Sequence, residues 1–478
     1  MILKQYYLGC LAHASYLIAD QASGQAAVVD PRRDVGQYVE DAARLGCRID
    51  HVFLTHFHAD FVAGHLELRA EEGARIYLGA LARAEYPFVP MADRASLRIG
   101  TVRLEVLETP GHSPESISIL VYEPATAEHP YAVLTGDTLF VGDVGRPDLR
   151  ASLGWSAKRL ASMLYDSLHE KLVPLPDGTL VYPAHGAGSL CGKNLSADTV
   201  STIGAQRLSN YALQPMSREQ FIDILTADQP DTPAYFTYDA ALNAHERQTL
   251  DQTLEQLRPL PLTRLLELVG DGAQLLDTRN PADFGGAHIR GAVNVSLDGS
   301  YENWCGTILD PERPIVLIGD PSREVEAAKR LGRVGFDDVA GYLTWRMPLE
   351  HEAGVIERTR RVTAAALAEL SAAGPPPLLV DVRSEHEWHA GRIDDAVNIP
   401  LSRLPRELTR LPSAWPLVAY CTTGYRSSIA SSLMRRAGRL AVTDLVGGIR
   451  AWEAQRLPMT RAVGMGPDPP VGRPQETR

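Results

Sequence analysis

Three strings that contain histidine or aspartate, each at the end of an apolar segment, most constrain how this chain folds. They are THFHADF (55–61), TPGHSP (109–114) and TGDTLF (135–140). Each follows a run typical of a buried strand and opens a loop that contains glycine or polar residues. Folds of the α/β class place their chemistry where strands end. Because imidazole and carboxylate groups are ligands of first-row metals, these strings predict a metal site at a sheet end.

Length and charge limit the remaining possibilities. The chain has 478 residues, which suggests about three domains. Its formal net charge of -12 argues against nucleic acid as a partner, because phosphate binding needs a basic face. No apolar run of about 18 residues is present, so no membrane partner or span is expected. Five cysteines without framework spacing, and a start without a long apolar run, predict a cytoplasmic protein.

The organisation of the chain is that of one unit followed by a repeat. Residues 1–255 alternate strands and helices, end in helical stretches around 217–227 and 240–257, and are predicted to form the first domain. A proline-rich string, LRPLPL (257–262), is interpreted as a linker. Two further domains are expected at 260–357 and 362–462, and a disordered tail at 463–478.

The duplication rests on two matching pairs of strings. LLDTR (275–279) is followed by AHIRGAVNV, and LVDVR (379–383) is followed by AGRIDDAVNI. In both copies the aspartate of the D-x-R string lies 17 residues before the asparagine, at Asp277 and Asn294 and again at Asp381 and Asn398. The constant offset of 104 positions indicates an internal repeat.

The first histidine string resembles the H-x-H-x-D-H string of the metallo-β-lactamase superfamily, whose fold is an αββα sandwich. In the two-metal members of that superfamily three histidines bind one ion, and they correspond here to His56, His58 and His112. The second ion is bound by an aspartate, the following histidine and a later histidine, while another aspartate bridges both ions. These positions correspond here to Asp60, Phe61, His185 and, for the bridge, Asp137.

Phe61 departs from that pattern, because a phenyl ring has no lone pair to offer, and it weakens the second site. The set His56, His112 and Asp137 remains, and two imidazoles with one carboxylate suit non-haem Fe(II) and O₂. This set matches the persulfide dioxygenase branch of the superfamily, whose members bind a single iron at the three equivalent positions. The resemblance extends over THFHAD (55–60), PGHSP (110–114) and GDTLFVGDVGRPD (136–148).

The resemblance implies one Fe(2+) per dioxygenase domain and the oxidation of a low-molecular-weight thiol persulfide by O₂ to sulfite. Glutathione, coenzyme A or a similar thiol is the expected carrier. His58, Asp60 and His185 then orient the ligands or the substrate. Arg146 is a candidate for binding a carboxylate of the thiol carrier, and the alternative is a salt bridge that fixes its loop.

The segment YPAHGAGSLCGK (182–193) resembles the subgroup in which the dioxygenase is fused to rhodanese domains (the CstB type). Cys191 in this segment is either a group near the metal that accepts or relays sulfane sulfur, or a small buried residue. Four further histidines lack matching strings and are interpreted as structural or surface residues: His13, His51, His65 and His129.

The repeats, together with the string CTTGYR (421–426), resemble the rhodanese sulfurtransferase domain, a doubly wound parallel sheet. Cys421 stands where a strand ends, before a tight loop and a helix, so backbone N–H groups stabilise its thiolate and persulfide anions. Gly424 permits the tight loop, and Arg426 adds charge and hydrogen-bond donors. Only four residues separate the cysteine from the arginine, whereas related phosphatases have five, which disfavours phosphate hydrolysis.

The first repeat differs at the corresponding place. Alignment of PIVLIGD (314–320) with PLVAYCT (416–422) puts Gly319 opposite Cys421, and the glycine–arginine loop is absent. Cys305 lies upstream in an unrelated stretch. The domain at 260–357 is therefore predicted to be catalytically inactive.

The complete prediction is an α/β and α+β multidomain protein, an αββα sandwich followed by two rhodanese-like domains. It is predicted to be a homo-oligomeric enzyme of sulfide detoxification that couples persulfide oxidation to sulfur transfer through Cys421 among persulfide, sulfite and thiosulfate. Two alternatives stay open. One is a zinc-dependent thioester hydrolase of the glyoxalase II type with accessory sulfurtransferase domains. The other is a non-enzymatic sulfur-relay partner.

Overall fold

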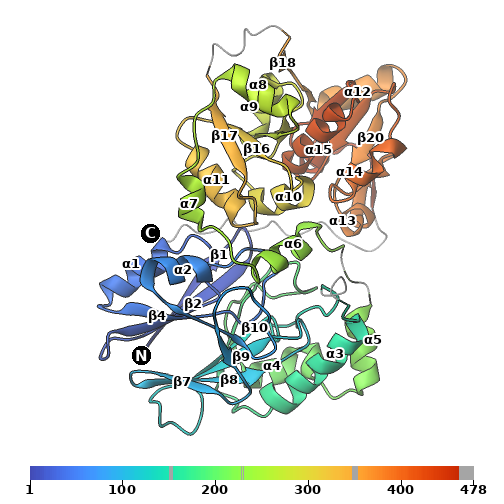
Figure 1. The fold of residues 1–478 in the computed structure, drawn as a ribbon. Helices are drawn as coiled ribbons and strands as arrows, with labels where there is room; N and C mark the ends of the chain where they lie inside the picture. Colours follow the sequence, from blue (N-terminus) through green and yellow to red (C-terminus); the bar gives the residue numbers. More distant parts are fainter. Residues whose placement is uncertain (150–153, 228, 230, 347–353, 462–478) are drawn as a thin grey trace. The chain divides into compact units, whose positions relative to one another are not determined.

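The computed structural model of the chain describes residues 1–149, 154–227, 229, 231–346 and 354–461 (Figure 1). The tail predicted to be disordered lies outside these residues. The chain divides into two compact units. The first comprises Met1–Ala273, Ser300–Val316 and Ser322–Leu343, and the second comprises Gln274–Gly299, Leu317–Pro321 and Thr344–Arg478.

The N-terminal part of the first unit is built from two six-stranded sheets, drawn blue to green in Figure 1. One sheet has the spatial order β1 (Ile2–Leu8), β2 (His13–Asp20), β3 (Gln25–Val29), β4 (Arg48–Phe53), β5 (Arg75–Gly79) and β6 (Val89–Met91). The other has the order β12 (Ser201–Thr202), β11 (Leu180–Pro183), β10 (Ala132–Gly136), β9 (Ile117–Tyr122), β8 (Val102–Glu108) and β7 (Ser96–Ile99).

One hydrophobic cluster fills the space between the two sheets. Tyr16 and Ile18 of β2 pack in it together with Ile119 and Val121 of β9. Their spacing of two follows from the alternation of side chains along a strand, so every second residue of each strand faces the opposite sheet. Burial of this apolar area is the main force that holds the sheets together.

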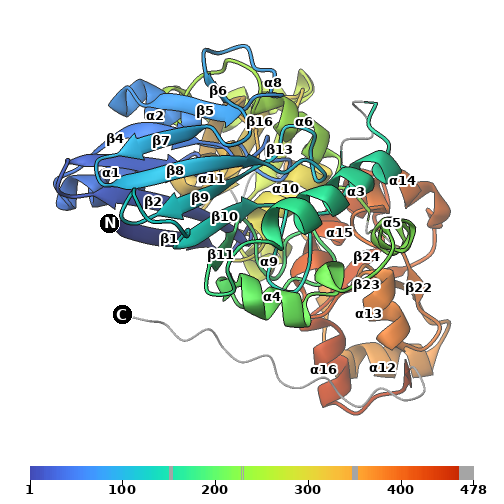
Figure 2. The same ribbon diagram turned by 90° about the horizontal axis from the view of Figure 1, so that it is seen from below.

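Helices cover the outer faces of both sheets. Helices α1 (Gly36–Arg44) and α2 (His65–Glu72) contact β4 of the first sheet. Helices α3 (Ala157–Asp166), α4 (Ile203–Ser209) and α5 (Arg218–Thr226) share a second hydrophobic cluster with β8 to β11 (Figure 2). The layers are therefore helix, sheet, sheet and helix, and the predicted αββα sandwich is confirmed.

The helical end of this region was only partly predicted. The stretch around 217–227 is α5, but the stretch around 240–257 is not one helix. It is divided into α6 (Tyr235–Leu242) and α7 (Leu250–Leu254). The interruption begins at Asn243, whose side chain bonds to the backbone of residues 58, 61 and 63. These tertiary hydrogen bonds have no counterpart in helical periodicity.

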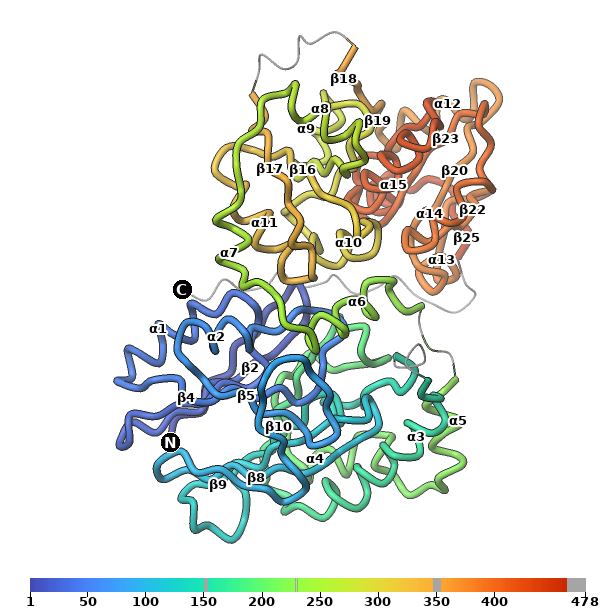
Figure 3. The backbone as a smooth tube through the Cα atoms, in the orientation of Figure 1, coloured from blue at the N-terminus to red at the C-terminus, as the bar shows by residue number. Residues whose placement is uncertain are grey.

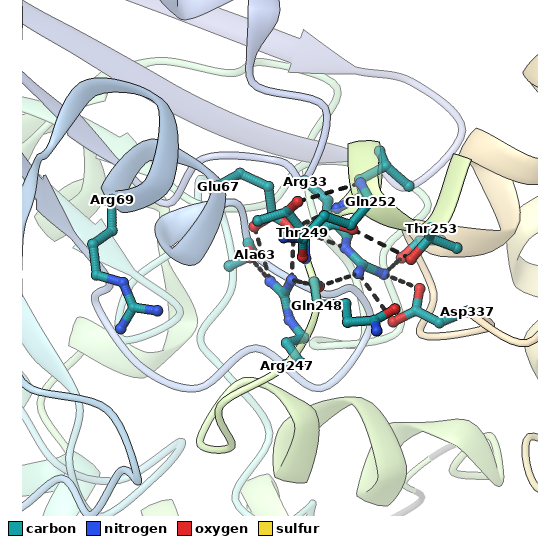
Figure 4. Close-up of polar contacts among 12 residues, drawn as sticks. Arg33, Ala63, Glu67, Arg69, Arg247, Gln248, Thr249, Gln252, Thr253 and Asp337 are labelled. Carbon is teal, nitrogen blue, oxygen red and sulfur yellow. Dashed lines mark hydrogen bonds and ion pairs between the residues drawn. The ribbon is translucent and has the colours of Figure 1, made fainter. Parts of the chain in front are cut away.

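A buried ion network joins this region to part of the first repeat (Figure 4). The Arg33 guanidinium is fully buried and donates to Glu67 at 3.0 Å and to Asp337 at 3.0 Å. Arg247 pairs with Glu67 from the other side at 2.6 Å. Burial acts to raise the pKa of Glu67, but the charges of Arg247 and Arg33 lower it to about 2. Residues near Asp337 therefore belong to the same compact unit as the sandwich.

The two repeats follow in the chain (Figure 3). The first contains α8 (Leu262–Gly270), β13 (Gln274–Asp277), α9 (Pro281–Gly286), β14 (His288–Ile289), β15 (Val293–Asn294), α10 (Tyr301–Ile308), β16 (Ile315–Gly319), α11 (Glu324–Gly332), β17 (Val339–Thr344) and β18 (Ile356–Glu357). The second contains β19 (Arg360–Val362), α12 (Ala364–Ala373), β20 (Leu378–Asp381), α13 (Glu385–Ala390), β21 (Gly391–Ile393), β22 (Val397–Asn398), α14 (Leu404–Glu407), β23 (Leu417–Tyr420), α15 (Tyr425–Arg436), β24 (Val442–Leu445), α16 (Gly448–Ala454) and β25 (Met459–Arg461).

Each repeat has its own sheet. The first has the strand order β15-β13-β16-β17, and the second has the order β19-β24-β23-β20-β22 with parallel neighbours throughout. In the second repeat, α12, α16 and the sheet enclose one hydrophobic cluster that includes Leu367, Tyr420 and Trp452. The predicted rhodanese-like doubly wound sheets are confirmed.

The shared D-x-R and asparagine strings have a structural explanation. In the first repeat Arg279 donates to Asp277 at 2.6 Å, and the Asn294 side chain donates to the backbone carbonyls of Asp277 and Arg279. In the second repeat the equivalent residues, which lie 104 positions later, make the same contacts. The strings therefore fasten the end of one strand to the next strand in both repeats.

Among the described residues, no helix combines the length and the apolar character that crossing a membrane requires.

Candidate metal centre and sulfur site

The predicted metal ligands come from loops that follow separate strands of the sandwich. His56 follows β4, His112 follows β8, and Asp137 comes directly after β10. Their donor atoms form a group in which every pair lies within 4.8 Å. The Nε2 atoms of His56 and His112 lie 3.7 and 3.5 Å from Oδ2 of Asp137. All three side chains are buried. The structure therefore brings the three residues together.

Hydrogen bonds orient both imidazoles with Nε2 toward the centre of this group. Nδ1 of His112 donates to the Arg146 carbonyl at 2.9 Å. Nδ1 of His56 lies 3.0 Å from the Thr55 hydroxyl, whose own proton goes to Asp30 at 2.8 Å, so this nitrogen also donates. Each Nε2 atom then carries a lone pair, as a metal ligand requires.

Asp137 supplies the carboxylate of the group. Its Oδ1 accepts a hydrogen bond from His185 at 2.7 Å, whereas its Oδ2 accepts none. Burial acts to raise the pKa of Asp137, but the charges of His185 and His56 lower it well below the ordinary value. An ionised, buried oxygen that accepts no hydrogen bond is unfavourable unless a cation faces it. The donor set therefore fits one divalent first-row metal ion.

The ligand positions of the second metal in two-metal relatives carry residues that are paired with one another here or that cannot bind a metal. His58, Asp60 and His185 form a neighbouring group of potential donors. His185, however, lies between two carboxylates, 2.7 Å from Asp137 and 2.9 Å from Asp60. Burial acts to lower the pKa of His185, but these carboxylates raise it well above the ordinary value. The ring of Phe61 lies 4.4 Å from that of His58 and is fully buried.

Arg146 and Cys191 lie in the wall beside the metal-donor group. The Arg146 guanidinium is buried and makes two hydrogen bonds to Asp148, at 2.8 and 2.7 Å. Its amide donates to the Cys191 carbonyl at 2.9 Å. The salt bridge expected as the alternative role of Arg146 is therefore present. Cys191 is buried within reach of Asp137 and His185, and burial, followed by the charges of Asp60 and Asp137, raises its thiol pKa well above the ordinary value.

Two further residues beside the metal-donor group were not predicted as site residues. His13, interpreted from the sequence as a structural or surface residue, is buried, and its ring lies 4.0 Å from that of Phe61 and 5.6 Å from that of His185. Asn243 is fully buried and donates to the carbonyls of His58 and Phe61 while accepting from the amide of Ala63. Neither residue stands in a recognisable string, so the sequence offered no signal for them.

A cavity of about 750 Å³ lies beside the loops that carry the ligands. Phe57 and Pro114, which line it, are one and two positions from His56 and His112 in the chain. The rest of its wall is largely apolar with a few polar groups and includes Leu81, Arg83, Trp155 and His245. A mostly apolar cavity of this size with few polar groups is typical of a site for a small organic ligand.

The sulfur site lies at the carboxyl end of β23. Cys421 is buried, and the amide of Gly424 donates to its Sγ at 3.1 Å. Gly424 has φ +108°, a conformation that residues with a Cβ rarely adopt, so this loop requires glycine. Helix α15 begins at Tyr425 and directs its N-terminal end toward the same region. The loop therefore stabilises negative charge on sulfur.

Arg426 is partly buried and is paired with a neighbouring carboxylate. Its guanidinium donates to Glu387 at 2.8 and 2.7 Å and to the Thr422 hydroxyl at 2.8 Å. Burial acts to raise the pKa of Glu387, but the hydrogen bonds and charge of Arg426 lower it to about 2. In the first repeat β16 ends at Gly319 with no sulfur at this place, and Cys305 lies in α10.

Comparisons with known proteins assign both parts of the chain to known families. The profile of the metallo-beta-lactamase superfamily matches residues 8–185, and that of the rhodanese-like domain matches residues 262–344 and 363–455. The chain is 29% identical to the persulfide dioxygenase ETHE1, mitochondrial, of Bos taurus over 52% of this chain and 88% of that protein. It is 33% identical to a hydroxyacylglutathione hydrolase of Methylococcus capsulatus over 36% of this chain and 60% of that protein.

A solved structure extends the comparison beyond the sandwich. The metallo-beta-lactamase from Staphylococcus aureus subsp. aureus COL is 34% identical, with a TM-score of 0.65, and the match covers 72% of this chain and 99% of that one. The match is longer than the sandwich alone. The chain therefore belongs to the metallo-beta-lactamase superfamily, as a member that joins persulfide dioxygenase homology to two rhodanese-like domains.

Proposed function

We propose that this protein is an Fe(II)-dependent persulfide dioxygenase that also transfers sulfur through a rhodanese cysteine. The observation that carries the proposal is the group of two imidazoles and one carboxylate, with Oδ2 of Asp137 ionised and accepting no hydrogen bond. Such a donor set suits non-haem iron. Fe(II) bound by His56, His112 and Asp137 would supply the activation of O₂, which redox-inert zinc does not provide.

The dioxygenase half consumes one thiol persulfide, one O₂ and one water, and releases the thiol, sulfite and two protons. The cavity beside Phe57 and Pro114 is the proposed place for the carrier, glutathione, coenzyme A or a similar thiol. Its largely apolar wall with few polar groups supports this placement. His185 orients the ligand Asp137 and is itself paired with Asp60 at 2.9 Å. His58, which contacts Asp30 at 3.0 Å, completes the proposed set of groups that orient the ligands or the substrate. Arg146 positions His112 through its backbone carbonyl.

The rhodanese half acts by thiolate attack. Cys421 attacks the terminal sulfur of a persulfide, the S–S bond breaks, and the carrier thiolate leaves. Sulfite then attacks the terminal sulfur of the cysteine persulfide, so thiosulfate leaves and the Cys421 thiolate is regenerated. The Gly424 amide stabilises the anions at each stage. Because thiolate exchange is reversible, the same residues also run the transfer from thiosulfate.

The proposal includes a division into three functional parts, 1–255, 260–357 and 362–462, with an inactive middle part. A cytoplasmic location and a homo-oligomeric state remain predictions. All five cysteines are described in the structure and are free thiols there. Size-exclusion chromatography with light scattering tests the oligomeric state.

The decisive experiment is an oxygen-electrode assay of protein loaded with Fe(II) or with Zn(II), using glutathione persulfide and coenzyme A persulfide. We expect O₂ uptake and sulfite only with iron. The hydroxyacylglutathione hydrolase relative makes a zinc thioesterase the competing function. Anaerobic cleavage of a thioester by the zinc protein, without persulfide oxidation by the iron protein, would overturn the proposal. Absence of both reactions would favour a non-enzymatic sulfur relay.

A further inference from the structure

A buried chain of polar contacts leads away from the sulfur of Cys421. Its Sγ lies 3.7 Å from the hydroxyl of Ser427, the third residue of α15. The Ser427 hydroxyl lies 2.6 Å from Oδ1 of Asp444 on β24. All three side chains are buried to within a few per cent, so water does not replace these contacts. The three groups form a hydrogen-bonded chain of sulfur, hydroxyl and carboxylate.

The direction of these hydrogen bonds follows from the single proton of the Ser427 hydroxyl. A serine hydroxyl has one proton to donate and two lone pairs to accept. The short contact with Asp444 takes that proton, because the carboxylate accepts. The remaining lone pairs of Ser427 face the thiol of Cys421, which donates. In this hydrogen-bonded chain the Cys421 thiol therefore donates to Ser427, and Ser427 donates to Asp444.

Asp444 lies in a setting that lets it accept a proton. Burial raises the pKa of its carboxyl, although the Ser427 hydrogen bond and the charge of Arg361 on β19 oppose that effect. Arg361 contacts the other carboxylate oxygen at 3.0 Å. Arg426 on α15 interacts electrostatically with Cys421, and Glu387 pairs with Arg426. A buried carboxyl of this kind accepts a proton more readily than an exposed one.

The sulfur also accepts a hydrogen bond from a backbone donor. The Gly424 amide points at Sγ from 3.1 Å, while Ser427 provides an acceptor for the thiol proton. A proton acceptor and an anion-stabilising donor are the two groups that conversion of a thiol to a thiolate needs.

We propose that Ser427 and Asp444 form a proton relay for Cys421, which rests on the proposed role of this cysteine as the sulfur carrier. The thiol proton passes from Sγ to the Ser427 oxygen while the Ser427 proton passes to Oδ1 of Asp444. The result is a thiolate that accepts from Ser427 and a neutral Asp444, with no change in total charge. The reverse transfer returns the proton when the thiol is restored. Ser427 contacts the reacting sulfur and is thus a catalytic residue. Asp444 acts through Ser427 and stores the proton.

The first repeat, which is predicted to be inactive, lacks the same hydrogen-bonded chain. Its strand β16 ends in Gly319 in place of a cysteine, and its helix α11, Glu324–Gly332, contains no serine or threonine. The sulfur and the hydroxyl are both absent there. In contrast, the Asp–Arg–Asn contacts at the strand ends are the same in both repeats.

The experiment measures alkylation of Cys421 by iodoacetamide in the full-length protein, resolved by peptide mass spectrometry, from pH 5 to pH 9. Ser427→Ala removes the relay, and Ser427→Thr restores a hydroxyl. Asp444→Asn keeps an acceptor for Ser427 but takes up no proton. Ser431→Ala is the matched control, because this serine is buried one turn further along α15 and its hydroxyl has no hydrogen-bond partner.

We expect Ser427→Ala and Asp444→Asn to slow alkylation of Cys421 at pH 7 about tenfold and to move the midpoint of the pH–rate profile upward by about one unit. Ser427→Thr and Ser431→Ala should match the wild type. Equal profiles for the wild type and Asp444→Asn, or an equal loss in Ser431→Ala, would overturn the relay. Because alkylation needs no sulfur transfer, failure of the proposed function would appear separately, as a Cys421→Ser variant that still forms thiosulfate.

Discussion

The metal-donor group takes its three side chains from loops that follow β4, β8 and β10, whereas the sulfur site is one continuous loop between β23 and α15. In the first case the proposed function rests on imidazole and carboxylate side chains. In the second it rests largely on backbone N–H groups and a helix end. The first arrangement needs the whole sandwich to be in place, while the second needs mainly one strand–loop–helix unit.

The contrast concerns which residues each site depends on. A ligand set collected from distant segments depends on residues that hold those segments, such as Asn243. A local loop depends on its own backbone conformation, as at Gly424. Substitutions therefore should separate the two activities, and remote substitutions should affect the metal centre more strongly than the sulfur loop.

The largest expected effect is at the nucleophile. Cys421→Ser should lower thiosulfate formation more than about 1000-fold, as loss of a nucleophile does, because a serine hydroxyl neither forms nor leaves as a persulfide. O₂-dependent formation of sulfite should stay at the wild-type rate. Ion chromatography of sulfite and thiosulfate in the same reaction measures both products. A parallel loss of O₂ uptake would contradict the separation of the two sites.

Loss of a metal ligand should have the reciprocal effect. His112→Ala should lower bound iron and O₂ consumption more than about 100-fold, because one of three ligands is lost. Sulfur transfer from thiosulfate through Cys421 should continue. Iron analysis and an oxygen electrode measure the result. Undiminished O₂ consumption would show that the ligand assignment is wrong.

A remote substitution tests the dependence on distant segments. Asn243→Ala leaves two carbonyls and one amide of residues 58–63 without their partner and should cost about 2–4 kcal/mol of stability. It should also weaken iron binding about tenfold. Thermal melting and iron titration measure these effects. Asn210→Ala is the matched control, since Asn210 is equally buried but bonds to the loop at residues 140–143.

The Asn210→Ala control distinguishes a loss of stability from a loss of ligand positioning. Asn210→Ala should lower the melting temperature without weakening iron binding as strongly. Equal iron affinities in the two variants would refute a special role of Asn243 in holding the ligand loop.

The smallest expected effect concerns the ion pair beside the sulfur loop. The pKa of Glu387 lies near 2 in the folded protein, below its ordinary value of 4.5. Because the folded-state pKa is the lower one, the pair stabilises the fold above about pH 4.5, and this contribution is lost as the pH falls toward 2. Amide hydrogen exchange of α13, corrected for its intrinsic pH dependence, should therefore rise over this range.

Glu387→Gln should abolish that pH dependence, since glutamine does not titrate. Glu385→Gln on the same helix is the control, because Glu385 pairs with Arg403 at the surface. An unchanged pH dependence in Glu387→Gln would assign the effect to another group.

Much of the fold could be predicted because its signals are local. Apolar runs before THFHADF, TPGHSP and TGDTLF identified strands whose ends meet, and the repeated D-x-R and A-V-N strings identified two copies of one domain. The helix expected over 240–257 was wrong, because Asn243 bonds to the backbone near His58 instead of continuing a helix. His13 and Asn243 could not be predicted beside the metal-donor group, because neither stands in a string.

The sequence alone determined which atoms can act: imidazole, carboxylate and thiol groups at strand ends, and a glycine–arginine loop after Cys421. These features depend on residue type and on spacing along a few residues, which the chain states directly. Only the tertiary structure decided that Oδ2 of Asp137 accepts no hydrogen bond, that Arg146 is paired with Asp148, and that Ser427 connects Cys421 to Asp444. Such contacts depend on the orientation of each side chain, which a sequence string does not state and which packing of the whole domain fixes.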